Sequence, residues 1–148
     1  MKEKALNAMK LEFPAKSVNE SFARSAVANF AAQCDPTVGI IADVKTAVSE
    51  AVTNAIVHAY AGYPDRDRRP VYIYCRITGS GKLVIKIRDK GKGIEDVKTA
   101  MEPLFTTDTD GERSGMGFTV MQSFCDRVKV TSRVGKGTSV TLEKRLKP

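Results

Sequence analysis

The sequence predicts an α+β protein: a two-layer α/β sandwich in which a mixed, largely antiparallel sheet carries its helices on one face. Two helical segments come first, a β-hairpin follows, and another helix precedes a last pair of strands. Strands joined by short turns pair antiparallel, so this order differs from that of a doubly wound parallel sheet. The 148 residues are enough for one core, and we expect a single domain over 1–148, with residues 1–8 as a flexible extension.

Apolar spacing and turn residues predict each element in order. Ser17 and Glu20 have the spacing of a capping box ahead of a helical pattern, and Asp35 followed by Pro36 suits the start of the next helix. Alternating segments on either side of short turns predict hairpins. The expected elements are a strand at 9–14, helices at 18–33 and 36–60, strands at 71–78 and 82–89, a short helix at 95–101, a helix at 116–127, and strands at 127–133 and 138–146.

Composition excludes several classes of protein. No apolar run approaches the roughly 20 residues that span a bilayer, and the N-terminus lacks the apolar part of a secretory signal, so we expect a cytoplasmic protein. The three cysteines lie far apart and form no metal-binding pattern, which predicts neither a disulfide nor a zinc site. The net charge of +7 suits an acidic partner, but no recognition-helix or aromatic-basic motif accompanies it, so we do not expect direct nucleic-acid binding.

The stretch SEAVTNAIVHAY at 49–60 places polar side chains on an otherwise apolar helix. Glu50, Asn54 and His58 follow at intervals of four, so they project from neighbouring turns as one stripe. A helix that only needs a solvated face more often carries Lys, Arg and several Glu there. One carboxylate, one amide and one imidazole therefore indicate a stripe that faces a site. We assign no role to His58.

A second motif is the Asp-x-Gly-x-Gly sequence at the end of the second hairpin strand. Asp89 ends that strand, and Gly91 and Gly93 follow it. Glycine allows a close approach of the backbone to a ligand, and the carboxylate can accept a hydrogen bond from an exocyclic amine. Taken alone, the motif fits a plain Asp-Gly turn equally well.

The third motif, ERSGMGF at 112–118, opens into a predicted helix. Backbone N–H groups freed by Gly115 and Gly117 at a helix N-terminus can bind an anion, and Arg113 can add a charged contact to a phosphate oxygen. A helix start after a flexible loop is the alternative reading. The segment at 102–114 has no periodicity and is expected to be mobile.

In this order, the three motifs resemble the Bergerat ATP-binding fold that gyrase, Hsp90, MutL and sensor histidine kinases share, and Gly137-Thr138 near the end fits it too. The segments NESFAR, SEAVTNAIVHAY, PLFTT and ERSGMGF further resemble the bacterial anti-sigma-factor serine kinases, most of all the sporulation type that acts on sigma F. The likeness runs from about Leu11 to Leu146. It departs from the family at Lys90 and Lys92, and in a more basic loop and more basic last strands.

The resemblance implies an anti-sigma factor that is also an ATP-dependent protein serine kinase. Such a protein, as an ATP-bound homodimer, holds a sporulation sigma factor inactive, and it phosphorylates a serine of an anti-anti-sigma factor. Arg24, in NESFAR, matches a partner-contacting position of this family, although an exposed helix arginine is an equally good reading. The sigma factor and the anti-anti-sigma factor are the expected partners.

The resemblance also implies roles for residues of the site. Asn54 would hold Mg²⁺, and Asp89, with Thr138 nearby, would bind the adenine of ATP. Arg113 and the amides of Gly115 and Gly117 would hold the phosphates, under a lid formed by residues 102–114. Glu50 lies one turn before Asn54 and can accept a proton from the attacking hydroxyl, so we assign it as the general base.

Four alternatives remain open from the sequence. The chain could be the catalytic domain of a sensor histidine kinase, but its one histidine lies in the nucleotide-site helix, so the phosphoacceptor would have to be on another chain. It could bind a sigma factor in an ATP-dependent way without phosphotransfer, or act in a stress response instead of sporulation. It could also be a basic domain that binds nucleic acid without ATP.

Overall fold

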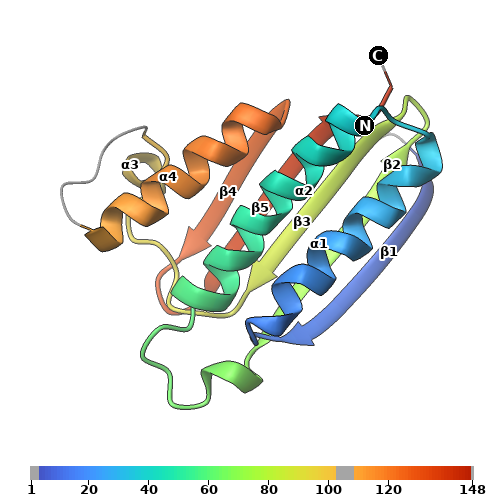
Figure 1. Ribbon diagram of the computed structural model, residues 1–148. Coiled ribbons are helices and arrows are strands. Elements are labelled where there is room, and N and C mark those ends of the chain that lie inside the picture. Colours follow the sequence, from blue (N-terminus) through green and yellow to red (C-terminus); the bar gives the residue numbers. More distant parts are fainter. Residues whose placement is uncertain (1–3, 103–108, 148) are drawn as a thin grey trace.

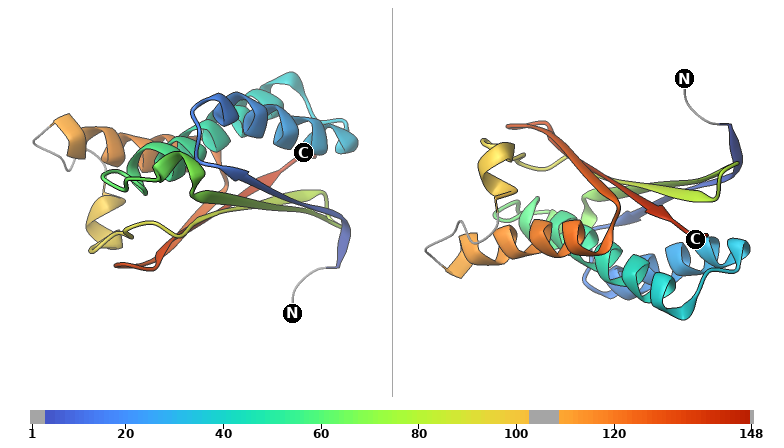
Figure 2. Two further views of the ribbon diagram at one scale, coloured as in Figure 1. Left: turned by 90° about the horizontal axis from the view of Figure 1, so that it is seen from below. Right: turned by 90° about the horizontal axis from the view of Figure 1, so that it is seen from above.

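The architecture is that of two layers, a sheet and a set of helices on one of its faces (Figures 1 and 2). The structure is a computed structural model that describes residues 4–102 and 109–147, the stretch 109–116 by its backbone alone. Its five strands have the order β1-β2-β3-β5-β4, and every neighbouring pair is antiparallel. The predicted α+β sandwich is therefore confirmed.

The strands agree with the alternation in the sequence. Apolar residues at every second position face the helices, as Ile73 and Ile85 do in two neighbouring inner strands, where both are fully buried. The strands are β1 (Ala5–Pro14), β2 (Pro70–Thr78), β3 (Lys82–Asp89), β4 (Arg127–Arg133) and β5 (Gly137–Arg145).

The helices form a single layer that buries small and branched side chains against the sheet, with Val48, Val52 and Met121 at its centre. Among the described residues, no helix has the length and apolar character needed to cross a bilayer. The helical elements are α1 (Val18–Ala31), η1 (Ala32–Cys34), α2 (Val38–Thr53), η2 (Asn54–His58), η3 (Arg66–Arg68), α3 (Val97–Ala100) and α4 (Thr109–Phe124).

The beginning of the chain is more ordered than the sequence suggests. Residues 5–8 were expected to belong to a flexible extension, but they are the first part of β1 and pair with the end of β2. Backbone pairing with a neighbouring strand needs no particular side chains, so composition gave no sign of it. Residues 1–3 lie outside the described part.

Two predicted helix caps are wrong. Ser17 makes no capping bond, and its intended partner Glu20 instead accepts a hydrogen bond from Thr53 Oγ1 on α2. Helix α2 is capped by Thr37, whose side chain accepts a bond from the Ile40 amide, while Asp35 takes a left-handed conformation with φ of 50° in the preceding turn. The helix thus starts two residues later than the Asp-Pro pair indicated.

The last helix differs most from its prediction. It was expected at 116–127, with Gly115 and Gly117 at its N-terminus, but α4 runs over Thr109–Phe124 and contains both glycines. Intrahelical hydrogen bonds engage backbone amides beyond the first turn, so the argument for an anion site at a helix start does not hold for these two amides in this arrangement. A mobile lid was expected at 102–114. Residues 103–108 of that range lie outside the described residues, and the residues from Thr109 onward belong to α4.

Candidate functional site

A cavity of about 350 Å³ opens where the C-terminal end of the α2–η2 helix meets the ends of β3 and β5. Most of its wall is apolar, and a few polar groups are set into it, which is the character of a site for a small organic ligand. Four of the predicted site residues line it, namely Asn54, Asp89, Gly93 and Thr138. The remaining lining residues are Ala51, Ala55, His58, Ala59, Ile87, Lys92, Ile94, Ala100, Phe118 and Val140.

The helix that carries the polar stripe changes its winding at the cavity. The α-helical part ends at Thr53, and Asn54–His58 form a π turn in which the Ala59 amide donates to the Asn54 carbonyl at 2.9 Å. Such wide turns often occur at functional sites because they shift side chains out of the regular helical register. Here both ends of the turn, Asn54 and His58, line the cavity.

Asn54 is the buried polar group of this cavity that most clearly requires a ligand. Its Nδ2 is buried and has no hydrogen-bond partner among the described residues. A buried polar atom left without a partner costs about 1–3 kcal/mol, so its persistence indicates a place for a group that the protein does not supply itself.

Glu50, Asn54 and Gly117 meet at one point. A Cβ atom added to Gly117 would lie 3.5 Å from Glu50 Oε2 and 3.5 Å from both side-chain heteroatoms of Asn54. The glycine thereby leaves open a space that two polar side chains of α2 and η2 face from one side. Glu50 is half-buried, and this burial raises the pKa of its carboxyl above the usual value.

Asp89 lines the cavity from the end of β3. It is 6% exposed, and its Oδ1 accepts hydrogen bonds from the Gly91 amide at 2.9 Å and the Thr138 amide at 3.2 Å. Burial raises the pKa of its carboxyl to about 6, although the two N–H bonds oppose this shift. Because both bonds use Oδ1, the other oxygen, Oδ2, remains for a donor in the cavity.

Thr138 is held by a small network that the sequence did not reveal. Its Oγ1 lies 2.8 Å from Ser132 Oγ, which donates to the Gly137 carbonyl at 3.1 Å and accepts from the Ile94 amide at 2.7 Å. Ser132 therefore joins β4, β5 and the loop after β3. Nothing in its sequence context distinguishes it from other serines in strands.

Tyr60 positions the loop that carries the glycines. It is fully buried, and its hydroxyl donates to the Pro70 carbonyl at 2.5 Å and accepts from the Lys90 amide at 2.8 Å. A buried tyrosine hydroxyl needs a partner, so a Tyr at the end of an apolar helix face was a signal that sequence reasoning missed.

Gly91 and Gly93 are needed for a different reason from the one inferred from the sequence. A Cβ at Gly91 would lie 2.2 Å from the Ala59 carbonyl oxygen, and one at Gly93, where φ is 76°, would lie 2.2 Å from the Arg133 carbonyl oxygen. Both glycines thus let this loop pack against the chain's own backbone, and the Lys92 amide donates to the Ala59 carbonyl at 2.9 Å. The two glycines therefore allow the loop to pack against the protein, and they affect a ligand only through the position of that loop.

The remaining predicted residues lie on the helices. Arg24 is half-buried on α1, and its guanidinium donates to Ser49 Oγ on α2 at 3.2 Å, next to Glu50 in sequence. Arg113 and Gly115 fall within the part of α4 described by its backbone alone, so their contacts stay predictions.

This fold and site define a class of nucleotide-binding domain. A family model described as a histidine kinase-like ATPase domain matches residues 13–144. Curated relatives named anti-sigma F factor are 54% identical over 138 residues in Caldanaerobacter subterraneus subsp. tengcongensis and 55% identical over 141 residues in Clostridium novyi, covering 93% and 95% of this chain and 93% and 96% of theirs. The chain therefore belongs to the histidine kinase-like ATPase family and, within it, groups with the anti-sigma F factors.

Two solved structures share the fold at low sequence identity. The RsbU and RsbW domains of Rv1364c from Mycobacterium tuberculosis match with a TM-score of 0.69 and 20% identity, over 95% of this chain and 32% of that one. The SiaB–SiaC complex from Pseudomonas aeruginosa matches with a TM-score of 0.66 and 12% identity, over 95% of this chain and 90% of that one. These matches support the two-layer fold alone.

Proposed function

We propose that the chain is an anti-sigma factor of the sigma F type and an ATP-dependent protein serine kinase that phosphorylates an anti-anti-sigma factor. Support comes from the relatives named anti-sigma F factor, which match over nearly the whole chain, and from the family's ATPase domain. The observation that carries the chemistry is the meeting of Glu50, Asn54 and Gly117, where the buried Asn54 Nδ2 has no protein partner among the described residues.

The cavity has a volume in the range of small-molecule sites, and its polar groups suit ATP. The apolar wall suits a purine, and Asp89 Oδ2 can accept a hydrogen bond from the adenine amino group, with Thr138 beside it. Asn54 would hold Mg²⁺ through its side-chain oxygen. Mg²⁺ keeps several waters and binds phosphates, so it does not require a cluster of carboxylates. The described residues contain no such cluster of three or more acidic, His or Cys side chains.

ATP would supply the phosphoryl group, and Mg²⁺ would neutralise charge on the phosphates. The main tasks of the protein are then to position the reactants and to accept a proton. Glu50 accepts the proton of the attacking serine hydroxyl. Its raised pKa suits this role because a general base works best with a pKa near the working pH. Asn54, one turn further along, is uncharged and adds no repulsion beside the phosphates.

Further parts of the proposal concern Arg113, the segment 102–114 and Arg24. Arg113 is proposed to hold the phosphates, and residues 102–114 to close over them. Arg24 is proposed to contact the sigma factor or the anti-anti-sigma factor. Its bond to Ser49 links this position to the helix that carries Glu50. We also propose that the active form is a homodimer.

Replacing the proposed base tests the proposal. Glu50→Gln should lower phosphoryl transfer from labelled ATP to an anti-anti-sigma protein by at least about a hundredfold, since general base catalysis contributes about 10²–10⁴. The affinity for ATP should stay within about threefold of the wild type, measured by calorimetry. The exposed Glu95→Gln is the matched control and should change neither quantity.

The site of the label decides between the kinase and its alternatives. Label on a serine of the partner, lost in Glu50→Gln, supports the proposal. Unchanged transfer in Glu50→Gln removes Glu50 as the base. ATP binding and sigma-factor binding with no labelled product in the wild type would instead favour a non-catalytic binding module.

A further inference from the structure

The face of the sheet opposite the helices carries a strong positive charge. The helices cover one face only (Figure 2). On β3, Lys86 and Arg88 alternate with the buried Ile85 and Ile87, so their side chains lie on the open face, where both are exposed. On β4, Lys129 and Arg133 are likewise exposed on this face.

The basic side chains stand in two rows, or walls, on β3 and β4, and the strand between them carries short side chains. β5 lies between β3 and β4, and its open-face residues Ser139 and Thr141 are short hydroxyl side chains. The register places Lys86 opposite Thr141, and Thr141 opposite Lys129, in one row across three strands. With strands about 4.8 Å apart, the walls stand about 10 Å from each other, which leaves room for one extended chain. We call these six residues, Lys86, Arg88, Lys129, Arg133, Ser139 and Thr141, the basic trough.

The end of the trough near the nucleotide cavity is hollowed. A depression of about 340 Å³ there includes Lys86, Arg88 and Arg133 among its lining, with Lys136 from the β4–β5 turn. Asp89 and Thr138 line this depression as well as the nucleotide cavity. The surface is therefore concave where its charge is densest.

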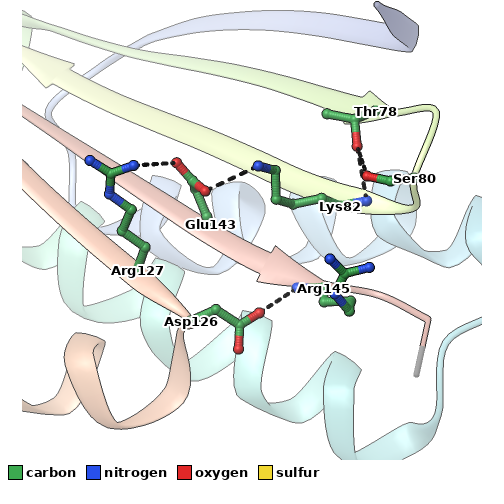
Figure 3. Close-up of polar contacts among 7 residues, drawn as sticks. All are labelled: Thr78, Ser80, Lys82, Asp126, Arg127, Glu143 and Arg145. Atoms are coloured by element: carbon green, nitrogen blue, oxygen red, sulfur yellow. Dashed lines mark hydrogen bonds and ion pairs between the residues drawn. The ribbon is translucent and has the colours of Figure 1, made fainter. Parts of the chain in front are cut away.

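The protein itself shows what fits between such walls. One row further along β5, Glu143 replaces the short hydroxyl residue (Figure 3). Its carboxylate accepts Lys82 of β3 at 3.3 Å on one side and Arg127 of β4 at 3.8 Å on the other. A carboxylate on the middle strand thus bridges the cations of both outer strands.

The basic trough lacks this internal partner. Among the described residues, no ion pair involves Lys86, Arg88, Lys129 or Arg133. Thr141 stands one row from Glu143, between Lys86 and Lys129, where the analogous carboxylate would be. The trough therefore offers positions for carboxylates that come from elsewhere.

The neighbouring aromatic residues favour a protein over a nucleic acid. Single-stranded nucleic acids gain much of their affinity from bases stacked on aromatic rings. The open-face tyrosines of β2 are half-buried and already covered, with Lys90 Nζ 5.3 Å from the ring centre of Tyr72 and Lys10 Nζ 5.9 Å from that of Tyr74. A second copy of this chain would bring like charges together.

We propose that the basic trough binds an extended acidic segment of a partner protein, whose Asp or Glu carboxylates lie over Ser139 and Thr141 as Glu143 lies between Lys82 and Arg127. This surface is on the opposite side of the sheet from the helices, and none of the six residues of the basic trough lines the nucleotide cavity. It is independent of the kinase activity proposed above.

The test introduces a carboxylate into the basic trough by mutation. Thr141→Glu should repeat the Glu143 bridge one row away and so weaken the binding of a fluorescein-labelled decaglutamate peptide by about tenfold, as measured by fluorescence anisotropy at low salt. Lys129→Glu, on an exposed position of an edge strand, should weaken it at least as much. Asn29→Glu adds the same charge as Thr141→Glu on an exposed position of α1 and should leave the peptide affinity within about twofold.

Each remaining outcome bears on the proposal. ATP affinity, measured on the same variants, should not change, which shows that the fold and the nucleotide cavity are intact. Undetectable peptide binding by the wild type, or equal losses in Thr141→Glu and Asn29→Glu, would overturn the proposal. The proposal would also be overturned if a labelled oligothymidylate bound more tightly than the peptide and Thr141→Glu abolished that binding, since the surface would then bind nucleic acid. A change of sedimentation-derived oligomeric state in Thr141→Glu would assign it to contacts between copies.

Discussion

Asp89 combines a proposed role in binding the adenine with a cost to the stability of the fold. It is almost fully buried, and burial raises its pKa to about 6, so at neutral pH the protein holds an ionised group in a place that disfavours charge. Two backbone amides, of Gly91 and Thr138, partly offset this cost and fix the side chain through Oδ1. The arrangement leaves Oδ2 as an acceptor for an amino group of a ligand.

Asp89→Asn should keep the fold and lose adenine recognition. The two amides that donate to Oδ1 require an acceptor there, so the new NH₂ group must take the place of Oδ2 and face the cavity as a donor. Two donors would then meet, and we expect the affinity for ATP to fall by about thirtyfold, or about 2 kcal/mol. Calorimetry with ATP measures this, with GTP for comparison; equal ATP affinity in the variant would show that Asp89 does not contact the base.

The same residue predicts a pH dependence of stability. Its pKa is higher in the folded protein than in the unfolded chain, so the folded protein binds the extra proton between pH of about 4 and about 6. The free energy of unfolding of the wild type should therefore fall, relative to Asp89→Asn, by up to about 3 kcal/mol as the pH rises through this window, and stay level above it. Urea denaturation at a series of pH values measures the difference; a difference that grows with pH would have the wrong sign.

At the scale of elements, the loop after β3 has the strictest requirements. It is clamped by the Tyr60 hydroxyl, the Ala59 carbonyl and the turn after β4, and two of its glycines pack against backbone where no Cβ fits. The sequence predicted that glycines are needed here. It could not tell that a helix end, instead of a ligand, occupies the space, because that contact joins residues about thirty positions apart in the chain.

Gly91→Ala should therefore be severely destabilising. A methyl group 2.2 Å from the Ala59 carbonyl oxygen forces the loop or the η2 helix to move, and we expect a loss of about 2–4 kcal/mol in the free energy of unfolding. Gly79→Ala is the matched control: it meets no atom within 4 Å, and its effect should stay within about 0.5 kcal/mol. Equal effects in urea denaturation would contradict the packing seen at Gly91.

The elements also show where sequence reasoning works. Period-two alternation located β2 and β3 to within a residue, because both faces of these strands have a fixed environment. Helix starts were less predictable: Ser17 satisfies the capping pattern, yet its partner Glu20 bonds Thr53 across the helix layer. A tertiary contact of this kind leaves no local signal. The same holds for Ser132 and Tyr60 at the site.

At the scale of the whole molecule, stability should decrease from the centre of the sheet to its edges. The strand order places β2, β3 and β5 between two neighbours each, while β1 and β4 form the edges. The apolar side chains of β4 are only half-buried, whereas Ile73 and Ile85 are fully enclosed. The nucleotide cavity lies where the ends of β3 and β5 meet the helix layer, so its wall combines rigid strand ends with helix α4.

Hydrogen exchange measures this gradient. Amides of Ile73 and Ile85 should be among the slowest to exchange, and those of β1 and β4 should exchange faster by at least about tenfold, because edge strands open without disrupting the core. Edge amides as slow as the central ones would mean that a further chain covers an edge in solution.

The wide turn at Asn54–His58 has a consequence for how this protein can change over time. A π turn contains one residue more than the α-helix around it, so deleting Ala55 would leave a more regular helix. That shorter helix would keep the parts on either side of the turn in nearly the same relative orientation, because an i→i+5 turn closes over one residue more than an i→i+4 turn. A one-residue deletion between Glu50 and Asn54 would instead rotate one of them by about 100° relative to the other, because each residue of an α-helix accounts for that much rotation. The wide turn is therefore a place where this helix can lose a residue without turning Glu50 away from Tyr60, whereas the α-helical part before it is not.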